Sequence, residues 1–454
     1  MPESKTIGAA SPARRAAFDI LRRVAQEDSY ASTLIAALPE GELSHEDRAL
    51  VQELVLGALR WQATLDYFIE HYAGRKIEKL DLPLVIALRL GIYQIRFLSR
   101  IPVSAAVNES VKLVKRARLT SAAGLANAVL RRAAEHCDEP AGAEISNDFD
   151  RAAVELSHPR WLLERWTETL GEDQTRQLAL ANNQSPVIAF RVNTIRSSVD
   201  DAIAELKIAG VETRPSNLTP GSCVAERGSG LALTRFAREG LIYIQDEASQ
   251  MVSLLLDAKP GQRILDLCAA PGSKSTHIAA LTNNEAWILA CDIHPKRLAI
   301  LRESSARLGV TNLSLLGLDA AGSLPFLESA PKFDRVLLDA PCSGTGTLRQ
   351  NPEIKWRLAS GDIARLAELQ LAMLENAATM VSTGGRLVYS TCSMEPEEGE
   401  RVIERFLASR LGNYFKAVVP EGFNPLATPE GFIRTYPHVS QVDGFFAAVL
   451  YRLG

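Results

Sequence analysis

The spacing of apolar side chains changes twice along the chain and predicts three regions of different structure. From residue 12 to about residue 136, apolar residues recur every three or four positions, as in LVQELVLGAL at 50–59. This spacing places them on one face of a helix, whereas strands would show alternation. No alternating run of β-branched residues occurs in this part of the chain. We therefore expect an all-α domain over residues 1–140.

A second region follows the polar segment DEPAGAEISND at 138–148, which contains Pro and Gly, has no apolar period and is the best candidate for a linker. The expected elements are a helix around 158–170, a strand at 187–193, a helix at 199–209 and short strands at 211–214 and 223–226. This mixture predicts a small α+β (RRM-like) module over residues 141–244.

From residue 245 onward, short apolar runs alternate with helical segments. The runs are RILDLC at 263–268, AWILACD at 286–292, LSLLGLD at 313–319, RVLLDA at 335–340 and RLVYSTC at 386–392. Continuous apolar runs of this length are typical of buried parallel strands, and their alternation with helices predicts a doubly wound, Rossmann-like α/β sheet over residues 245–454. In such a sheet the first, fourth and fifth runs would be neighbours, so that their carboxyl ends share one crevice.

The turn after the first of these strands is built from small residues. It runs from Cys268 to Ser273 and enters a helix through Lys274. Small residues allow a ligand to lie against the backbone at the end of a sheet. The turn has neither the GxGxxG nor the GxxxxGK[ST] spacing, which disfavours recognition of a pyrophosphate.

Acidic residues end the next three strands, at Asp292, Asp319 and Asp339. A carboxylate at the end of the second strand typically accepts hydrogen bonds from ribose hydroxyls. A rim of acids suits an adenosine with a positively charged substituent better than a dinucleotide, and predicts S-adenosylmethionine as the cofactor. The alternative is that these acids only cap helix N-termini, a position that carboxylates often fill.

Two cysteines follow the fourth and fifth strands, Cys342 in DAPCSGTG and Cys392 in STCS. A thiolate that adds to C6 of cytosine makes C5 nucleophilic enough to take a methyl group from a sulfonium. Asp339 could then hydrogen-bond the N3 and amino edge of the base. These residues do not decide which cysteine attacks, and a buried cysteine can also serve only as a small apolar side chain.

Composition narrows the class of protein further. The six cysteines form no CxxC pair and the seven histidines are dispersed, so we expect neither a disulfide framework nor a metal site. No run approaches the ~18 apolar residues of a membrane span. The first twenty residues lack the apolar core of a secretory signal, and we expect a cytoplasmic protein.

The net charge of −4 does not by itself point to nucleic acid, but its distribution is uneven. Residues 82–134 contain nine basic residues, listed here, against the single acid Glu109: Arg89, Arg96, Arg100, Lys112, Lys115, Arg116, Arg118, Arg131 and Arg132. Such a surplus is a candidate site for a polyanion. The alternative is that these basic side chains only lie on solvent-exposed faces of helices.

The blocks DLCAAPGSK, DAPCSGTG and STCS resemble the RNA cytosine-C5 methyltransferase family of the Sun or NSUN type. The resemblance covers residues 245–454 and implies that Cys392 is the nucleophile and that Cys342 helps to release the product. It also implies contacts to S-adenosylmethionine from Cys268, Ala269, Ala270, Pro271, Gly272, Ser273, Lys274, Asp292, Asp319 and Asp339. Ser273 departs from the family, which usually has a second glycine there, and we expect a small effect on binding.

The segments ALRLGIYQIRFL, IPVSAAVNESVKLVKR and NAVLRR resemble a NusB-like RNA-binding domain. This domain, a small middle module and a methyltransferase core occur in the same order in the bacterial RsmB type. The resemblance implies an enzyme that methylates one cytosine of 16S ribosomal RNA. We expect it to be a monomer that acts on naked RNA or on an early precursor particle. Two alternatives stay open: methylation of an amino group, and a non-catalytic RNA-binding assembly or antitermination factor. The first usually needs an Asn/Asp-Pro-Pro-aromatic block, where this chain has Asp339-Ala340-Pro341-Cys342.

Overall fold

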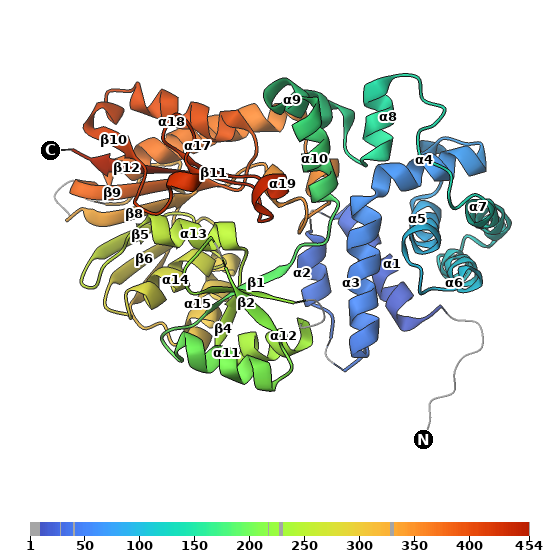
Figure 1. The fold of residues 1–454 in the computed structure, drawn as a ribbon, viewed down its shortest axis with the longest axis horizontal. Coiled ribbons are helices and arrows are strands. Elements are labelled where there is room, and N and C mark those ends of the chain that lie inside the picture. The colour runs from blue at the N-terminus through green and yellow to red at the C-terminus, as the bar shows by residue number, and fades with distance from the viewer. Residues whose placement is uncertain are drawn as a thin grey trace. The chain divides into compact units, whose positions relative to one another are not determined.

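The chain divides into two units in the computed structural model, which describes residues 10–27, 29–39, 41–216, 218–226, 230–326 and 331–453. The first unit comprises residues 1–185 together with 348–357, and the second comprises residues 186–347 together with 358–454 (Figure 1). Positions 140 and 244, expected as domain boundaries, therefore lie within the first and the second unit. The first nine residues, which belong to the segment considered for a secretory signal, lie outside the described residues.

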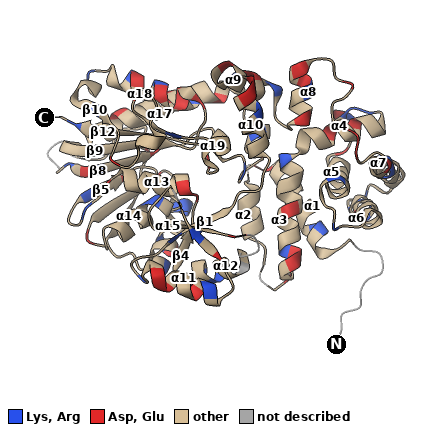
Figure 2. Ribbon diagram, viewed as in Figure 1, with Lys and Arg blue, Asp and Glu red and all other residues tan. Residues whose placement is uncertain are grey.

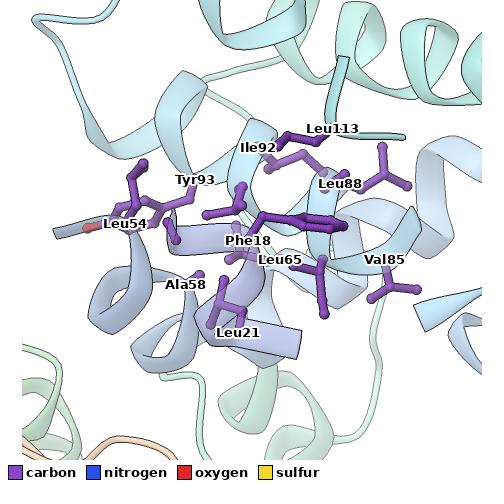
Figure 3. Close-up of a cluster of buried hydrophobic side chains, with 14 of the residues drawn as sticks. Phe18, Leu21, Leu54, Ala58, Leu65, Val85, Leu88, Ile92, Tyr93 and Leu113 are labelled. Atoms are coloured by element: carbon purple, nitrogen blue, oxygen red, sulfur yellow. The ribbon is translucent and has the colours of Figure 1, made fainter. Parts of the chain in front are cut away.

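The first unit is helical, as predicted. Its helices are α1 (Pro12–Gln26), α2 (Ala31–Ala36), α3 (His45–Arg60), α4 (Gln62–Ala73), α5 (Leu82–Phe97), α6 (Val103–Arg116), α7 (Ala123–Glu135), α8 (Asp148–Glu155), α9 (Arg160–Leu170), α10 (Glu172–Asn182) and the short α16 (Ile354–Arg357). Side chains spaced by three or four meet in one core, where Phe18, Leu54, Leu65 and Leu88 are buried (Figure 3). Burial of this continuous apolar surface is the main source of stability for helices of this length.

Local signals set where these helices begin and end. The Ser44 hydroxyl accepts a hydrogen bond from the Asp47 backbone N–H at 3.1 Å and caps α3, whose first turn also carries acids. Gly74 ends α4 in the left-handed conformation, with φ of 61°, where a side chain would cost conformational energy.

Residues 348–357 belong to the helical unit, although they follow the DAPCSGTG block in sequence. The Lys355 ammonium is buried and donates hydrogen bonds to the Arg60 carbonyl at 3.0 Å and to Asn183 Oδ1 at 3.1 Å. The Trp356 indole N–H donates to the Leu59 carbonyl at 2.6 Å. The expected core over 245–454 is thus interrupted by a segment that completes the helical unit.

The second unit begins with a four-stranded antiparallel sheet. Its elements are β1 (Ile188–Val192), α11 (Val199–Ile208), β2 (Thr213–Pro215), β3 (Ser222–Ala225), α12 (Gly230–Glu239) and β4 (Ile242–Ile244). The strand order β2-β3-β1-β4 with the chain order βαββαβ is a ferredoxin-like arrangement. The α+β class was predicted, but α12 and β4 were not.

The remainder of this unit is an eight-stranded, mostly parallel sheet with helices. The elements are α13 (Glu247–Leu255), β5 (Arg263–Asp266), α14 (Ser273–Leu281), β6 (Trp287–Asp292), α15 (Pro295–Leu308), β7 (Leu313–Gly317), β8 (Phe333–Asp339), α17 (Ser360–Thr379), β9 (Val381–Thr391), α18 (Glu400–Leu407), β10 (Phe415–Val418), β11 (Ile433–Thr435), α19 (Pro437–Ser440) and β12 (Phe445–Arg452). The strand order is β10-β12-β9-β8-β5-β6-β7, with β11 paired to β12. Strands β5 to β9 pair in parallel and β12 is antiparallel to β9. The predicted doubly wound sheet is confirmed, with β5 beside β8 and β8 beside β9.

Successive side chains on these strands enter two different cores. Leu265 packs with residues of α17 and α18, whereas the preceding Ile264 packs with residues of α13 and α14. The helices accordingly cover opposite faces of the sheet (Figure 1). Because both faces are buried, the strands are apolar throughout, and this explains the continuous runs in the sequence.

Candidate active site

The small-residue turn after β5 is held between the ends of β5 and β6. The Ala269 N–H donates to the Cys291 carbonyl at 2.8 Å, and the Ala270 N–H donates to Asp292 Oδ2 at 3.3 Å. The Arg297 guanidinium donates to the Ala270 carbonyl at 2.6 Å. These bonds fix the backbone of the turn at the carboxyl edge of the sheet.

Gly272 requires the absence of a side chain for two reasons. Its φ is 111°, and a Cβ would lie 2.2 Å from Cδ1 of the buried Leu301. Ser273, where the family usually has glycine, is the first residue of α14 and needs no such conformation. The departure at this position therefore imposes no backbone strain.

Asp266 is a site residue that the sequence reasoning missed. It is the last residue of β5 and is buried; its Oδ2 accepts a hydrogen bond from the Ser275 hydroxyl at 2.6 Å. No group in the described part of the chain donates to Oδ1. Burial raises the pKa of Asp266 to about 7, although the Ser275 bond opposes this shift.

Of the three acids that were predicted from strand ends, two lie beside this turn. Asp292 accepts the His294 N–H at 2.9 Å as well as the Ala270 N–H. Asp339 accepts Lys274 Nζ at 2.6 Å and the Ser390 hydroxyl at 2.8 Å. Asp319 is exposed, and its side chain accepts the Ala321 N–H of its own loop at 2.9 Å.

The charge of these acids acts on the thiol of Cys268. Burial raises the pKa of Cys268 well above its usual range, and Asp266, Asp339 and Asp292 add to the shift in that order. The cluster of acids at the ends of the strands therefore consists of Asp266, Asp292 and Asp339. Asp292 and Asp319 also accept backbone N–H groups two residues onward, but neither is the N-cap of a described helix: His294 is the N-cap of α15, and Asp319 lies in the loop after β7.

The two cysteines from the ends of β8 and β9 are in contact. Their Sγ atoms lie 3.3 Å apart, and both side chains are half-buried. The hydrogen bond to Cys392 raises the pKa of Cys342 well above its usual range, and burial and the Glu398 carboxylate raise it further. Burial also raises the pKa of Cys291, to about 12, so that this thiol keeps its proton at neutral pH.

Glycine in the SGTG block lets the two cysteine loops approach each other. The Gly346 N–H donates to the Cys392 carbonyl at 3.0 Å, and the Gly346 carbonyl accepts the Gly444 N–H at 2.8 Å. A Cβ on Gly346 would lie 2.0 Å from the Gly444 carbonyl oxygen. Glycine is the residue that fits between these backbones.

Charged residues of both signs occur along the helices of the first unit, α3 among them (Figure 2). Five of the nine basic residues in 82–134 donate to groups of the protein: Arg89 to Asp66, Arg96 to the carbonyls of His136 and Glu139, Lys112 to Glu109, Arg116 to Asp19, and Arg132 to the Tyr72 carbonyl. Arg100, Lys115, Arg118 and Arg131 are exposed and have no ion pair within the described residues. The polyanion prediction thus rests on these four side chains.

The described residues contain neither a candidate metal site nor a helix that could span a membrane. No group of three or more His, Cys, Asp or Glu there could hold a metal ion. No helix in the same part of the chain has both the length and the apolar character needed to cross a bilayer.

Known families match all three parts of the chain. Residues 253–451 match the family "16S rRNA methyltransferase RsmB/F", and residues 11–135 match the NusB family. Residues 158–228 match the "Methyltr_RsmF/B-like, ferredoxin-like domain". A Synechocystis protein named "Probable ribosomal RNA small subunit methyltransferase B" is 38% identical over 451 residues, which cover 97% of this chain and 99% of that protein. The chain belongs to the RsmB/F family of 16S rRNA methyltransferases.

Other relatives agree with the RsmB/F assignment. "Ribosomal RNA small subunit methyltransferase B" of Pseudomonas syringae is 36% identical over 433 residues, which cover 94% of this chain and 93% of that protein. The crystal structure of PH0851 matches with a TM-score of 0.82 at 29% identity and covers 98% of this chain and 99% of that one. The predicted RsmB/Sun-type methyltransferase with a NusB-like N-terminal domain is confirmed.

The RsmB/F family uses S-adenosylmethionine, and the turn after β5 fits that cofactor. Asp266 Oδ1 is buried and lacks a hydrogen-bond donor within the described residues, which leaves an acceptor for a ligand at the end of β5. The Asp292 and Asp339 carboxylates act on this site as negative charges, which suits a sulfonium cation. The residues present therefore suit the cofactor predicted from the sequence.

Proposed function

We propose that this protein transfers a methyl group from S-adenosylmethionine to C5 of a cytosine in 16S ribosomal RNA through a covalent bond between a cysteine and C6. The observation that carries the proposal is the 3.3 Å contact between Cys342 and Cys392 at the ends of neighbouring parallel strands. Two thiols in contact beside an S-adenosylmethionine turn suit a reaction that must form and then break a bond to a pyrimidine ring.

Cys392 acts as the nucleophile and Cys342 as the residue that assists release. The hydrogen bond to Cys392 raises the pKa of Cys342, which disfavours Cys342 as the thiolate that attacks C6 and favours Cys392 as the nucleophile. The resemblance to the Sun-type family favours the same assignment.

Asp339 and Lys274 orient the base. The Asp339 carboxylate lies at the end of β8, three residues before Cys342, and each of its oxygens already accepts one hydrogen bond. Each oxygen retains a lone pair that can accept from the protonated N3 or the amino group of cytosine. The Lys274 ammonium supplies a compensating positive charge beside this carboxylate.

The turn from Cys268 to Lys274, together with Asp292 and Asp319, holds the cofactor, which supplies the electrophilic methyl group when bound. After transfer, solvent water accepts the C5 proton, the C–H electron pair forms the C5–C6 double bond, and the Cys392 thiolate leaves C6. Cys342 assists this elimination from its position against the Cys392 sulfur. The target cytosine must leave its stack to reach the thiols, at a cost of about a few kcal/mol.

The experiment uses methyl-labelled S-adenosylmethionine and 16S rRNA, with nucleoside analysis for 5-methylcytosine. Cys392→Ala should abolish product, and Cys342→Ala should accumulate a covalent protein–RNA adduct stable to denaturation. Cys137→Ala, which alters a half-buried cysteine of the helical unit, is the control and should keep wild-type turnover. Full turnover by Cys392→Ala would refute the proposed nucleophile.

The remaining aspects of the proposal concern substrate form and organisation. We propose that the enzyme is a cytoplasmic monomer with functional parts at 1–140, 141–244 and 245–454, and that it acts on naked 16S rRNA or an early precursor particle. Methylation of naked transcripts compared with reconstituted 30S subunits tests the substrate. Equilibrium dialysis with S-adenosylmethionine separates an active core from a non-catalytic assembly or antitermination factor, which would not bind it.

A further inference from the structure

One buried carboxylate contacts the loops of both cysteines. Glu398 Oε1 accepts the Ser343 backbone N–H at 2.9 Å, and its Oε2 accepts the Ser393 hydroxyl at 2.6 Å and the Ser343 hydroxyl. Ser343 directly follows Cys342, and Ser393 directly follows Cys392. The two serine hydroxyls also lie 3.0 Å from each other. A single side chain thus joins the residues that follow the two thiols.

Glu398 is itself fixed by hydrogen bonds from residues of β9 and α17. Its carbonyl accepts the Tyr389 hydroxyl at 2.7 Å, and its Oε1 also accepts the Gln370 amide at 2.9 Å. The same Gln370 amide donates to the Pro341 carbonyl at 2.9 Å, immediately before Cys342. Glu398, Tyr389 and Gln370 are all fully buried. The carboxylate therefore has a fixed position relative to β9 and α17.

We infer that Glu398 is a positioning residue that holds the Cys342 and Cys392 sulfurs at the spacing needed for attack and release. The expected effect of Glu398 on catalysis rests on the proposed function, whereas its effect on the distance between the two sulfurs does not. Glu398 contacts neither thiol directly in the described structure, so it acts through Ser343 and Ser393.

A carboxylate suits this role better than an amide. Four donors converge on Glu398: two N–H groups on Oε1 and two hydroxyls on Oε2. A glutamine of the same shape would present an NH₂ group to one of these pairs and lose acceptors for it. Glu398→Gln therefore weakens the clamp while nearly preserving the volume of the side chain.

The formation of a disulfide between the two thiols measures their spacing without RNA or cofactor. Diamide oxidises the thiols: each loses a proton, the two sulfurs form one bond, and the two electrons and two protons reduce the azo group to a hydrazine. The rate is followed as the Cys342–Cys392 linked peptide by mass spectrometry, in wild type, Glu398→Gln and Ser393→Ala. Glu397→Gln, a change at the adjacent and more exposed glutamate, is the matched control.

We expect disulfide formation at least tenfold slower in Glu398→Gln, slower in Ser393→Ala and unchanged in Glu397→Gln. The direction is informative because the Glu398 charge disfavours the Cys342 thiolate. Loss of that charge alone would accelerate oxidation, so slower oxidation reports a lost spacing. In the methylation assay, kcat should fall at least tenfold with little change in KM for S-adenosylmethionine.

Disulfide formation that is as fast as in wild type, or faster, in both Glu398→Gln and Ser393→Ala would overturn the inference. If Glu398→Gln fails to give a wild-type circular dichroism spectrum, Ser393→Ala decides alone, since it removes a single hydroxyl. A slow disulfide in Glu398→Gln together with full turnover in Cys392→Ala would uphold the clamp and reject the proposed nucleophile. Failure of the Glu398 inference and failure of the proposed nucleophile are therefore distinguishable.

Discussion

Lys274 Nζ lies 2.6 Å from Asp339 Oδ2, and the two side chains are 9% and 25% exposed. This ion pair joins the first turn of α14 to the end of β8. The ammonium also donates to the Ser249 hydroxyl at 3.2 Å and lies 5.4 Å from the centre of the Phe445 ring. Burial acts to lower the pKa of Lys274, but Asp339 outweighs this effect and the pKa is raised. The pair therefore stays charged beside the proposed base-binding edge.

Removal of one partner of this pair should cost more stability than removal of both. Lys274→Met leaves a carboxylate without its counter-charge and should destabilise the fold by about 3 kcal/mol, as should Asp339→Asn, because a buried charge loses its partner. The double variant should be clearly less destabilised than the sum of the two. Urea unfolding in a double-mutant cycle measures this coupling.

The exposed pair Arg405–Glu368 in the same unit provides the control, since it should couple by no more than about 1 kcal/mol. Additive effects of Lys274→Met and Asp339→Asn would show that the pair contributes no more than a surface contact.

Gly346→Ala should disable the cysteine loops without loss of the cofactor turn. The new Cβ would lie 2.0 Å from a backbone oxygen of Gly444, so the loop that carries Cys342 must shift. We expect methylation to fall about 100-fold, because displacements of about 1 Å in a reacting group have effects of this size. Binding of S-adenosylmethionine by calorimetry should stay within twofold of wild type.

Gly361→Ala is the matched change, because nothing lies within 4 Å of the Cβ at that helical position. Equal activity of the Gly346 and Gly361 variants would show that the SGTG loop tolerates a side chain.

Those parts of the site that follow from strand order could be predicted from the sequence. Apolar runs and helical segments alternate, so the crossover rule places the ends of β5, β8 and β9 side by side, and with them Cys342 and Cys392. The helical first unit could be predicted equally well, because apolar residues recur every three or four positions throughout it.

Residues whose role depends on tertiary contacts were not predictable in this way. Asp266 lies inside the expected RILDLC run, and the sequence does not show that β5 ends at this residue, as β6 and β8 end at Asp292 and Asp339. Glu398 is one of several acids in MEPEEGE; Glu395 is equally buried, and only the hydrogen bonds from Ser343 and Ser393 distinguish Glu398. Nothing in the sequence of residues 348–357 indicates that Lys355 and Trp356 pack into the helical unit, because that packing depends on distant backbone carbonyls.

The raised pKa of Asp266 predicts a specific dependence of stability on pH. In the folded state Asp266 binds its proton up to about pH 7, whereas in the unfolded chain it releases the proton near pH 4. Its contribution to stability therefore falls as the pH rises from 4 to 7, by up to about 1.4 kcal/mol per pH unit. Asp266→Asn removes this titration.

The unfolding free energy of Asp266→Asn relative to wild type should thus increase between pH 5 and pH 7 and level off above pH 8. Urea unfolding of both proteins at half-unit pH steps gives this difference, in which the titration of all other groups cancels. A difference that does not change with pH would mean that Asp266 is ionised throughout this range.

The exposed basic residues of the helical unit should differ in their effect on RNA binding according to their partners. Lys115 and Arg116 are adjacent at the end of α6, and both are exposed. Arg116 donates twice to the Asp19 carboxylate, at 2.8 Å each, whereas Lys115 has no ion pair among the described residues. A phosphate can be bound by Lys115 without breaking an existing ion pair.

Lys115→Gln should therefore weaken binding to 16S rRNA uniformly and reduce the slope of log Kobs against log salt by about 0.7 to 0.9, the value of one phosphate contact. Arg116→Gln removes the same charge from nearly the same place but should leave the slope unchanged. Because both variants change the long-range field equally, the difference between their slopes isolates the direct contact. Fluorescence anisotropy of a labelled rRNA fragment between 50 and 300 mM salt is the measurement. Equal slopes for the two variants would show that Lys115 makes no direct phosphate contact.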